Sequence, residues 1–213
     1  MRNRMIWMAM LALLFSGEAV ESRAAESGAT VAWILTRLGE QAPKRIAFIE
    51  LHTSALLKRP LQVRGYLERP DALRLVRIVE FPYQERLELG QDHATLQRGQ
   101  QTLTVVRYDH VPALATLHAC LLDVFAGRKD QLEHFTTLRS QGTTQAWMLL
   151  IVPHEANAGF HSLRLYGHQG RVDCLVSQPT KGHAQYTLLG DEMVVRGQSL
   201  QHEQTVATLC SLG

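Results

Sequence analysis

The spacing of hydrophobic residues changes along the chain, and each change indicates a different kind of secondary structure. In residues 27–41 apolar side chains recur at helical intervals, with polar residues between them. Thr30 precedes the apolar positions as a candidate N-cap. The pattern predicts one amphipathic helix, whose buried face consists of Val31, Ile34, Leu35 and Leu38.

From residue 45 onward the hydrophobic spacing shortens to the two-residue period of β-strands. Short breaks that contain Gly or Asp interrupt this pattern as far as residue 109. Such breaks are typical of hairpins, so the region predicts an antiparallel meander of about six strands. Gly65 is expected at a β-bulge. Arg77 interrupts an apolar face that consists of Leu73, Leu75 and Val79.

The middle of the chain, residues 110–142, returns to helical spacing. Gly127 breaks the pattern, and residues 130–138 predict a second, shorter helix. The apolar positions of the first helix are Leu114, Leu117, Leu121 and Leu122.

The last third of the chain predicts about five more strands. Residues 144–154 are apolar on both faces, so we expect this strand to be covered on two sides. Residues 160–179 and 183–200 each predict a hairpin, and residues 203–212 predict a final helical turn. The second hairpin is expected to turn at Gly190. Because helices and strands do not alternate, a parallel sheet is disfavoured, and the predicted class is α+β, mainly β.

The first residues predict export from the cytoplasm. Arg2 and Arg4 precede a short apolar run, and small residues follow it, which is the pattern of a secretory signal peptide. The run is roughly half the length of about 20 residues that a membrane-spanning helix needs. We expect cleavage after residue 24 or after Ala19. Residues 1–24 are then the signal peptide, and residues 25–213 form one periplasmic domain.

The charge composition limits the kinds of partner that we expect, and the predicted compartment limits the state of the cysteines. The chain has 22 Lys and Arg against 20 Asp and Glu and no basic block, so nucleic acid is not an expected partner. An oxidising compartment permits one disulfide and one free thiol among Cys120, Cys174 and Cys210. The spacing of these cysteines leaves the pairing open.

Motifs of the common enzyme classes are missing from the sequence. The chain has no G-x-S-x-G, no Gly-rich phosphate loop and no H-E-x-x-H. Its ten histidines are scattered without the spacing of metal ligands. We therefore expect no catalytic residue, no metal and no cofactor. The many apolar positions are compatible both with a filled core and with a hydrophobic cavity beneath a helix.

Three stretches resemble a known family. GYLERPDALR at residues 65–74 and FPYQERLELGQDHATL at residues 81–96 resemble consecutive strands of the LolA family. AFIE at residues 47–50 resembles its first strand, and residues 110–142 fall where the family has its lid helices. The chain thus resembles the LolA-like periplasmic carriers of outer-membrane lipoproteins, in particular a LolA-related branch of that family.

The resemblance implies an incomplete antiparallel β-barrel with helices over its open side and an apolar interior that takes acyl chains. Arg69 falls on the family's arginine that bonds to the lid in the closed state. The implied lid residues are Arg69, Leu114, Leu117 and Leu121, and the implied cavity residues are Phe48, Leu67, Leu73, Leu75, Leu89, Trp147 and Leu149.

The resemblance also implies a function and partners. We expect a monomeric periplasmic carrier, not an enzyme, which binds the acyl chains of lipoproteins. It would receive them from an inner-membrane exporter and deliver them to an outer-membrane acceptor. An alternative is a carrier of another amphiphile, such as a glycolipid or an acylated pigment precursor, that works with a membrane exporter. A hydrolase that uses the same cavity and a structural β-domain without a cavity are the remaining alternatives.

Overall fold

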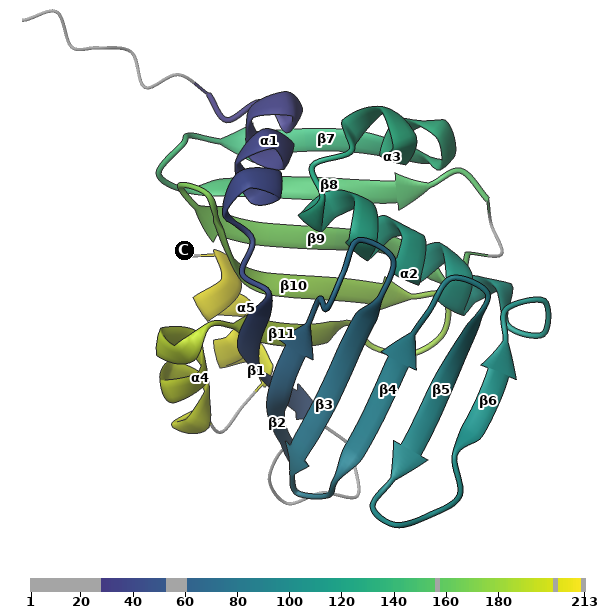
Figure 1. The fold of residues 1–213 in the computed structure, drawn as a ribbon. Helices are drawn as coiled ribbons and strands as arrows, with labels where there is room; N and C mark the ends of the chain where they lie inside the picture. The colour runs from purple at the N-terminus through teal and green to yellow at the C-terminus, as the bar shows by residue number, and fades with distance from the viewer. Residues whose placement is uncertain (1–27, 53–60, 156–157, 201–202, 212–213) are drawn as a thin grey trace, which may run out of the picture.

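Eleven strands form one antiparallel sheet in the computed structural model, which describes residues 28–52, 61–155, 158–200 and 203–211 (Figure 1). The predicted signal peptide, residues 1–24, lies outside these ranges. The strand order is β6-β5-β4-β3-β2-β1-β11-β10-β9-β8-β7, so β6 and β7 are edges and the barrel stays open. The strands are β1 (Arg45–His52), β2 (Leu61–Glu68), β3 (Leu75–Phe81), β4 (Glu85–Leu89), β5 (His93–Arg98), β6 (Thr104–Arg107), β7 (Thr136–Gly142), β8 (Trp147–Pro153), β9 (Phe160–His168), β10 (Arg171–Pro179) and β11 (Gln185–Leu189).

Helices pack on both faces of this sheet (Figure 1). Helices α1 (Val31–Gln41), α2 (Pro112–Phe125) and α3 (Lys129–Phe135) cover one face, called here the inner face. Helices α4 (Asp191–Gln198) and α5 (Glu203–Ser211) cover part of the other, the outer face. The predicted class, a mainly β fold with an open antiparallel barrel and covering helices, is confirmed.

Helix α1 has the start and the buried face that its spacing predicts. The Thr30 hydroxyl accepts a hydrogen bond from the N–H of Trp33 at 3.2 Å and caps the helix. Ile34, Leu35 and Leu38 are fully buried against the inner face of the sheet.

Gly65 lies at the predicted bulge, because the pairing of β2 with β3 shifts register between Arg64 and Gly65. A Cβ atom at this position would collide with the carbonyl oxygen of Ile78. Only glycine lets the two strands approach this closely, so the bulge depends on the residue type.

One predicted element is wrong, and another is shorter than predicted. Residues 191–198 form α4 rather than the second strand of a hairpin. Gly190 adopts a φ of 93°, Asp191 and Glu192 favour the positive end of the new helix, and Met193 packs on the outer face. The short second helix ends at Phe135, and the following residues form strand β7 instead, paired along its length with β8.

The composition of strand β8 predicts that both of its faces are covered, but the structure contradicts this prediction. Trp147, Leu149 and Ile151 are buried on the inner face. On the opposite face Met148 is only half-buried and Val152 is 37% exposed. The outer-face helices pack instead on β1, β10 and β11, so these strands, and not β8, carry two covered faces.

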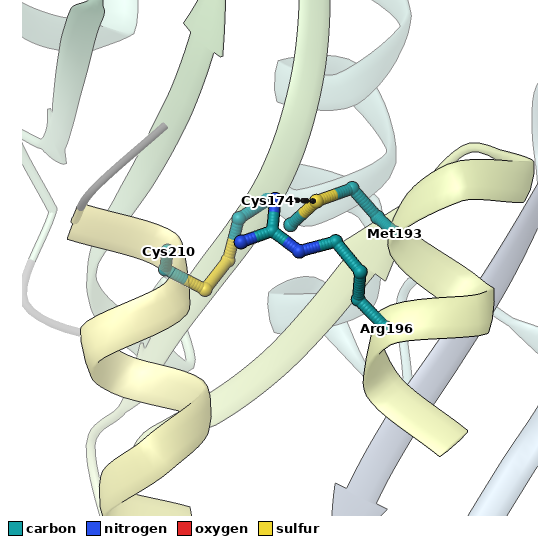
Figure 2. The surroundings of a disulfide bond; sticks show 4 residues. All are labelled: Cys174, Met193, Arg196 and Cys210. Carbon is teal, nitrogen blue, oxygen red and sulfur yellow. Dashed lines mark hydrogen bonds between the residues drawn. A yellow bond between two sulfur atoms is a disulfide. The ribbon is translucent and has the colours of Figure 1, made fainter. Parts of the chain in front are cut away.

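The structure assigns the cysteine pairing that the sequence left open. Cys174 on β10 and Cys210 on α5 form a disulfide, with their Cα atoms 5.5 Å apart (Figure 2). The bond ties α5 to the outer face beside Met193 of α4. Cys120 is a buried free thiol on α2, and burial raises its pKa to about 12.

Of the helices within the described ranges, none combines the length and the apolar character that crossing a membrane requires.

Candidate ligand-binding site

A cavity of about 550 Å³ opens at one rim of the barrel. It lies where the end of α1 and the start of β1 meet the end of β2, the last residue of α2 and the turn between β9 and β10. Its volume falls within the range of roughly 300–1,000 Å³ that is usual for small-molecule sites. Its apolar wall consists of Leu38, Ile46, Ala47, Leu67, Leu75, Phe125 and Val172.

Charged side chains surround the apolar wall. Arg45, Arg69 and Arg171 line the cavity together with Glu68 and Asp191. Arg45 pairs with Glu68 at 3.4 Å, and its guanidinium lies 3.8 Å from the centre of the Tyr66 ring. The cavity therefore combines an apolar interior with a rim of charged groups, which suits an amphiphile.

Arg69 connects the sheet to α2. Its guanidinium Nη1 donates a hydrogen bond to the carbonyl oxygen of Phe125, the last residue of α2. Its backbone N–H donates to the Lys44 carbonyl at 2.8 Å, which holds the residue at the cavity rim. The negative end of a helix dipole attracts a cation, so the contact stabilises the present position of α2. That α2 moves as a lid stays a prediction.

The predicted lid leucines lie on the side of α2 that faces the sheet. Leu114, Leu117 and Leu121 pack in one cluster with Leu75 and Leu89. Leu117 also contacts the larger cluster beneath α1. Helix α2 thus covers the apolar part of β3 to β5, and its movement would expose that surface.

The structure separates the predicted cavity residues into three groups. Leu67 and Leu75 line the cavity. Phe48, Trp147 and Leu149 belong to the filled core beneath α1, and Leu89 is buried beneath α2. These four side chains are therefore packed in the core and do not line a cavity.

Leu73 belongs to the third group, because it is 52% exposed and lies outside the cavity. Its prediction assumed that strand β3 begins before Leu75. The Asp71 carboxylate instead accepts hydrogen bonds from the Leu73 N–H at 2.9 Å and from the Arg74 side chain at 2.7 Å. This local turn delays the strand and leaves the Leu73 side chain in solvent.

A chain of charged groups crosses the inner face beyond the cavity, and the sequence analysis missed it. Arg77 lies 2.8 Å from Glu50 and 3.3 Å from Glu85, and Arg98 lies 2.7 Å from Glu85. The Arg77 guanidinium also lies 5.0 Å from the centre of the Phe48 ring. The interruption of the apolar face by Arg77 was the one signal of this network in the sequence.

The network keeps Glu50 ionised in a half-buried position. Burial would raise the pKa of Glu50, but the hydrogen bond with His52 and the charge of Arg77 outweigh it, and the pKa is lowered from its ordinary value. This part of the inner face is therefore polar. The apolar surface near this network lies in the cavity and beneath α2 instead.

A buried histidine lies on α2 itself. His118 has its Nδ1 3.3 Å from the hydroxyl of Tyr108, which donates to the Gly90 carbonyl at 2.9 Å, while His118 Nε2 has no hydrogen-bond partner among the described residues. Burial lowers the pKa of His118 more than the neighbouring Leu73 backbone and Asp123 raise it. Over the described ranges, no three His, Cys, Asp or Glu side chains come together as a metal site.

Comparison with known proteins points to one family. Residues 23–212 match a family described as "Outer membrane lipoprotein carrier protein LolA-like". Among solved structures, a LolA superfamily protein from Nitrosomonas europaea matches with 8% identity and a TM-score of 0.40, over 76% of this chain and 90% of that chain. A search of curated proteins found no match.

Proposed function

Because the chain belongs to the LolA-like family of outer membrane lipoprotein carriers, we propose that it carries acylated cargo across the periplasm. The members of this family are carrier proteins rather than enzymes. The observation that supports the proposal is the apolar cavity of about 550 Å³ beside α2, the helix that Arg69 holds in place. An inner-membrane exporter would supply the cargo, and an outer-membrane acceptor would take it.

Apolar burial supplies the binding free energy. Each methylene group that leaves water contributes about 0.8 kcal/mol, so a single acyl chain provides a large driving force. A chain too long for the cavity requires the leucines of α2 to separate from Leu75 and Leu89. Helix α2 would then be a two-state element: its open position admits the chain, and its closed position competes with the chain for the same apolar surface.

The cysteine chemistry supports the proposed compartment. Disulfides persist in the periplasm and are rare in the reducing cytosol. The Cys174–Cys210 bond is therefore in keeping with the export that the first residues predict.

A matched pair of leucine substitutions tests the cavity. Leu67, on strand β2, lines it, whereas Leu73, five residues beyond the end of that strand, is exposed in the following turn. We expect Leu67→Gln to weaken binding of a fluorescent fatty acid at least about tenfold, since apolar contact is replaced by a polar group. Leu73→Gln should bind as the wild type does. Equal binding by all three proteins would contradict the proposed site.

Mass spectrometry of the molecules that copurify with the protein from the native periplasm identifies the cargo. An acylated peptide supports the lipoprotein carrier, and a free acylated lipid supports the carrier of another amphiphile. If no acylated molecule copurifies and no acyl probe binds, the proposed function is wrong.

Arg69→Leu tests the role of α2 in release. Without the bond to the Phe125 carbonyl, the closed position of α2 is less stable and competes less with bound cargo. We expect the variant to load the methyl ester of a fluorescent fatty acid normally and to transfer it to lipid vesicles several-fold more slowly, measured by stopped-flow fluorescence. The ester is used because it has no charge that could bind Arg69 directly. Unchanged transfer would remove Arg69 from the mechanism.

A further inference from the structure

The charges at the cavity rim do not balance within the protein. Glu68 pairs with Arg45. Arg69 donates to a neutral carbonyl group, that of Phe125. Within the described part of the chain, the side chain of Arg171 has neither a hydrogen bond nor an ion pair. Against these two guanidinium groups the rim holds one further carboxylate, that of Asp191, which has no hydrogen bond or ion pair with any residue that the structure describes. The rim therefore carries a positive excess directly beside an apolar wall.

Arg171 is placed at this rim by the fold around it. It begins strand β10 after the turn from β9. A Cβ atom added to Gly190 would lie 3.8 Å from Nη2 of Arg171, so the guanidinium lies against the junction of β11 and α4. The neighbouring residue Val172 contributes to the apolar wall of the same cavity. Cationic and apolar contacts are thus available to one ligand.

Guanidinium groups bind carboxylates and phosphates through paired, charge-assisted hydrogen bonds. Such bonds are stronger beside a low-dielectric wall than in open water. An amphiphile that places an anionic head group at the rim and its chain on the apolar wall would satisfy both features of the site.

We propose that the cavity selects amphiphiles with an anionic head group, a carboxylate or a phosphate, through Arg171 and Arg69. This inference rests on the proposed carrier function and specifies the class of cargo. The head group would also compete with the Phe125 carbonyl for Arg69, so binding of the cargo would loosen the hold of Arg69 on α2.

Three probes test which head-group charge the full-length protein prefers. They share one dansyl-labelled undecyl chain and differ in the head group, which is a carboxylic acid, its methyl ester or an amine. We expect the acid to bind at least about tenfold more tightly than the ester at pH 8, and the amine most weakly. Equal affinities of acid and ester would overturn the head-group inference and leave the carrier function standing. Binding of none of the probes would remove the carrier function as well.

The variant Arg171→Gln tests whether Arg171 is responsible for the tighter binding of the acid. We expect it to weaken binding of the acid about tenfold and to leave binding of the ester within twofold, because only the acid uses the guanidinium. Arg139→Gln, a change at an exposed position of β7, is the matched control and should alter neither affinity. If Arg171→Gln weakens both probes equally or neither, Arg171 does not bind a head group.

Inorganic phosphate separates a lipid head group from a free anion. We expect phosphate at millimolar concentration to leave the acid probe bound, because the undecyl chain of the probe supplies most of its affinity. Displacement of the acid by phosphate alone would indicate a free-anion site and overturn the proposed class of cargo.

Discussion

The inner faces of the two halves of the sheet differ in what lies on them. On the C-terminal half, Leu149, Ile151, Leu163 and Leu165 are fully buried in one apolar cluster. On the N-terminal half, Arg77 and Glu85 form ion pairs on the inner face, and the cavity opens beside Leu67. The C-terminal half is therefore a filled core that holds the shape of the sheet. The N-terminal half contains the charged network and much of the cavity wall, to which Arg171 and Val172 of the C-terminal half also contribute.

The largest effect expected from this difference is on stability. Leu149→Ala opens a cavity in the filled half and should lower the free energy of unfolding by about 2–5 kcal/mol. Leu67→Ala, the same change at the existing cavity, should cost about 1 kcal/mol because part of this side chain already faces open space. Urea unfolding followed by tryptophan fluorescence measures both. Equal losses would mean that the two halves are packed alike.

A second, smaller effect tests the charged network. Arg77→Met leaves Glu50 and Glu85 without their shared partner and should cost about 3 kcal/mol at pH 7, the low end for breaking a buried ion pair. The pKa of Glu50 is lowered in the folded protein. Its pairing therefore stabilises the fold above the ordinary pKa of 4.5 and loses this effect as pH falls through the lowered value.

The difference between wild type and Arg77→Met should accordingly shrink in urea titrations below pH 4.5. Arg74→Met, which breaks exposed ion pairs at the residue just before the same strand, β3, is the control and should show no measurable loss. A constant difference at all pH values would indicate that packing against Phe48, rather than charge, explains the role of Arg77.

The smallest effect concerns His118 on α2. Because burial lowers its pKa below the ordinary value of 6.5, the unfolded chain binds a proton before the folded one does. The free energy of unfolding should therefore decrease as pH falls from about 6.5. We expect this decrease to be smaller than the losses caused by Leu149→Ala and Arg77→Met. His118→Gln should abolish this pH-dependent part, whereas His110→Gln, at an exposed position, should retain it. An unchanged slope in His118→Gln would contradict the assignment.

Sequence patterns predicted the elements whose spacing is strong and local. The face of α1 and the leucines of α2 follow directly from helical periodicity, and Gly65 marked the bulge because no other residue fits there. The resemblance of residues 65–74 to the LolA family also directed attention to Arg69, which contacts α2. Where a local turn competes with the pattern, as at Asp71, the alternation placed Leu73 wrongly.

The sequence by itself determined the mainly β class, the family and the order of most elements, because these depend on the period of apolar residues and on short stretches of chain. Only the tertiary structure decided that Cys174 bonds to Cys210, that Arg77 joins two carboxylates and that Arg171 reaches the same cavity as Arg69. Each of these arrangements brings together residues from different strands or helices. Their meeting depends on strand register and on the packing of helices over the sheet, which no single stretch of sequence contains.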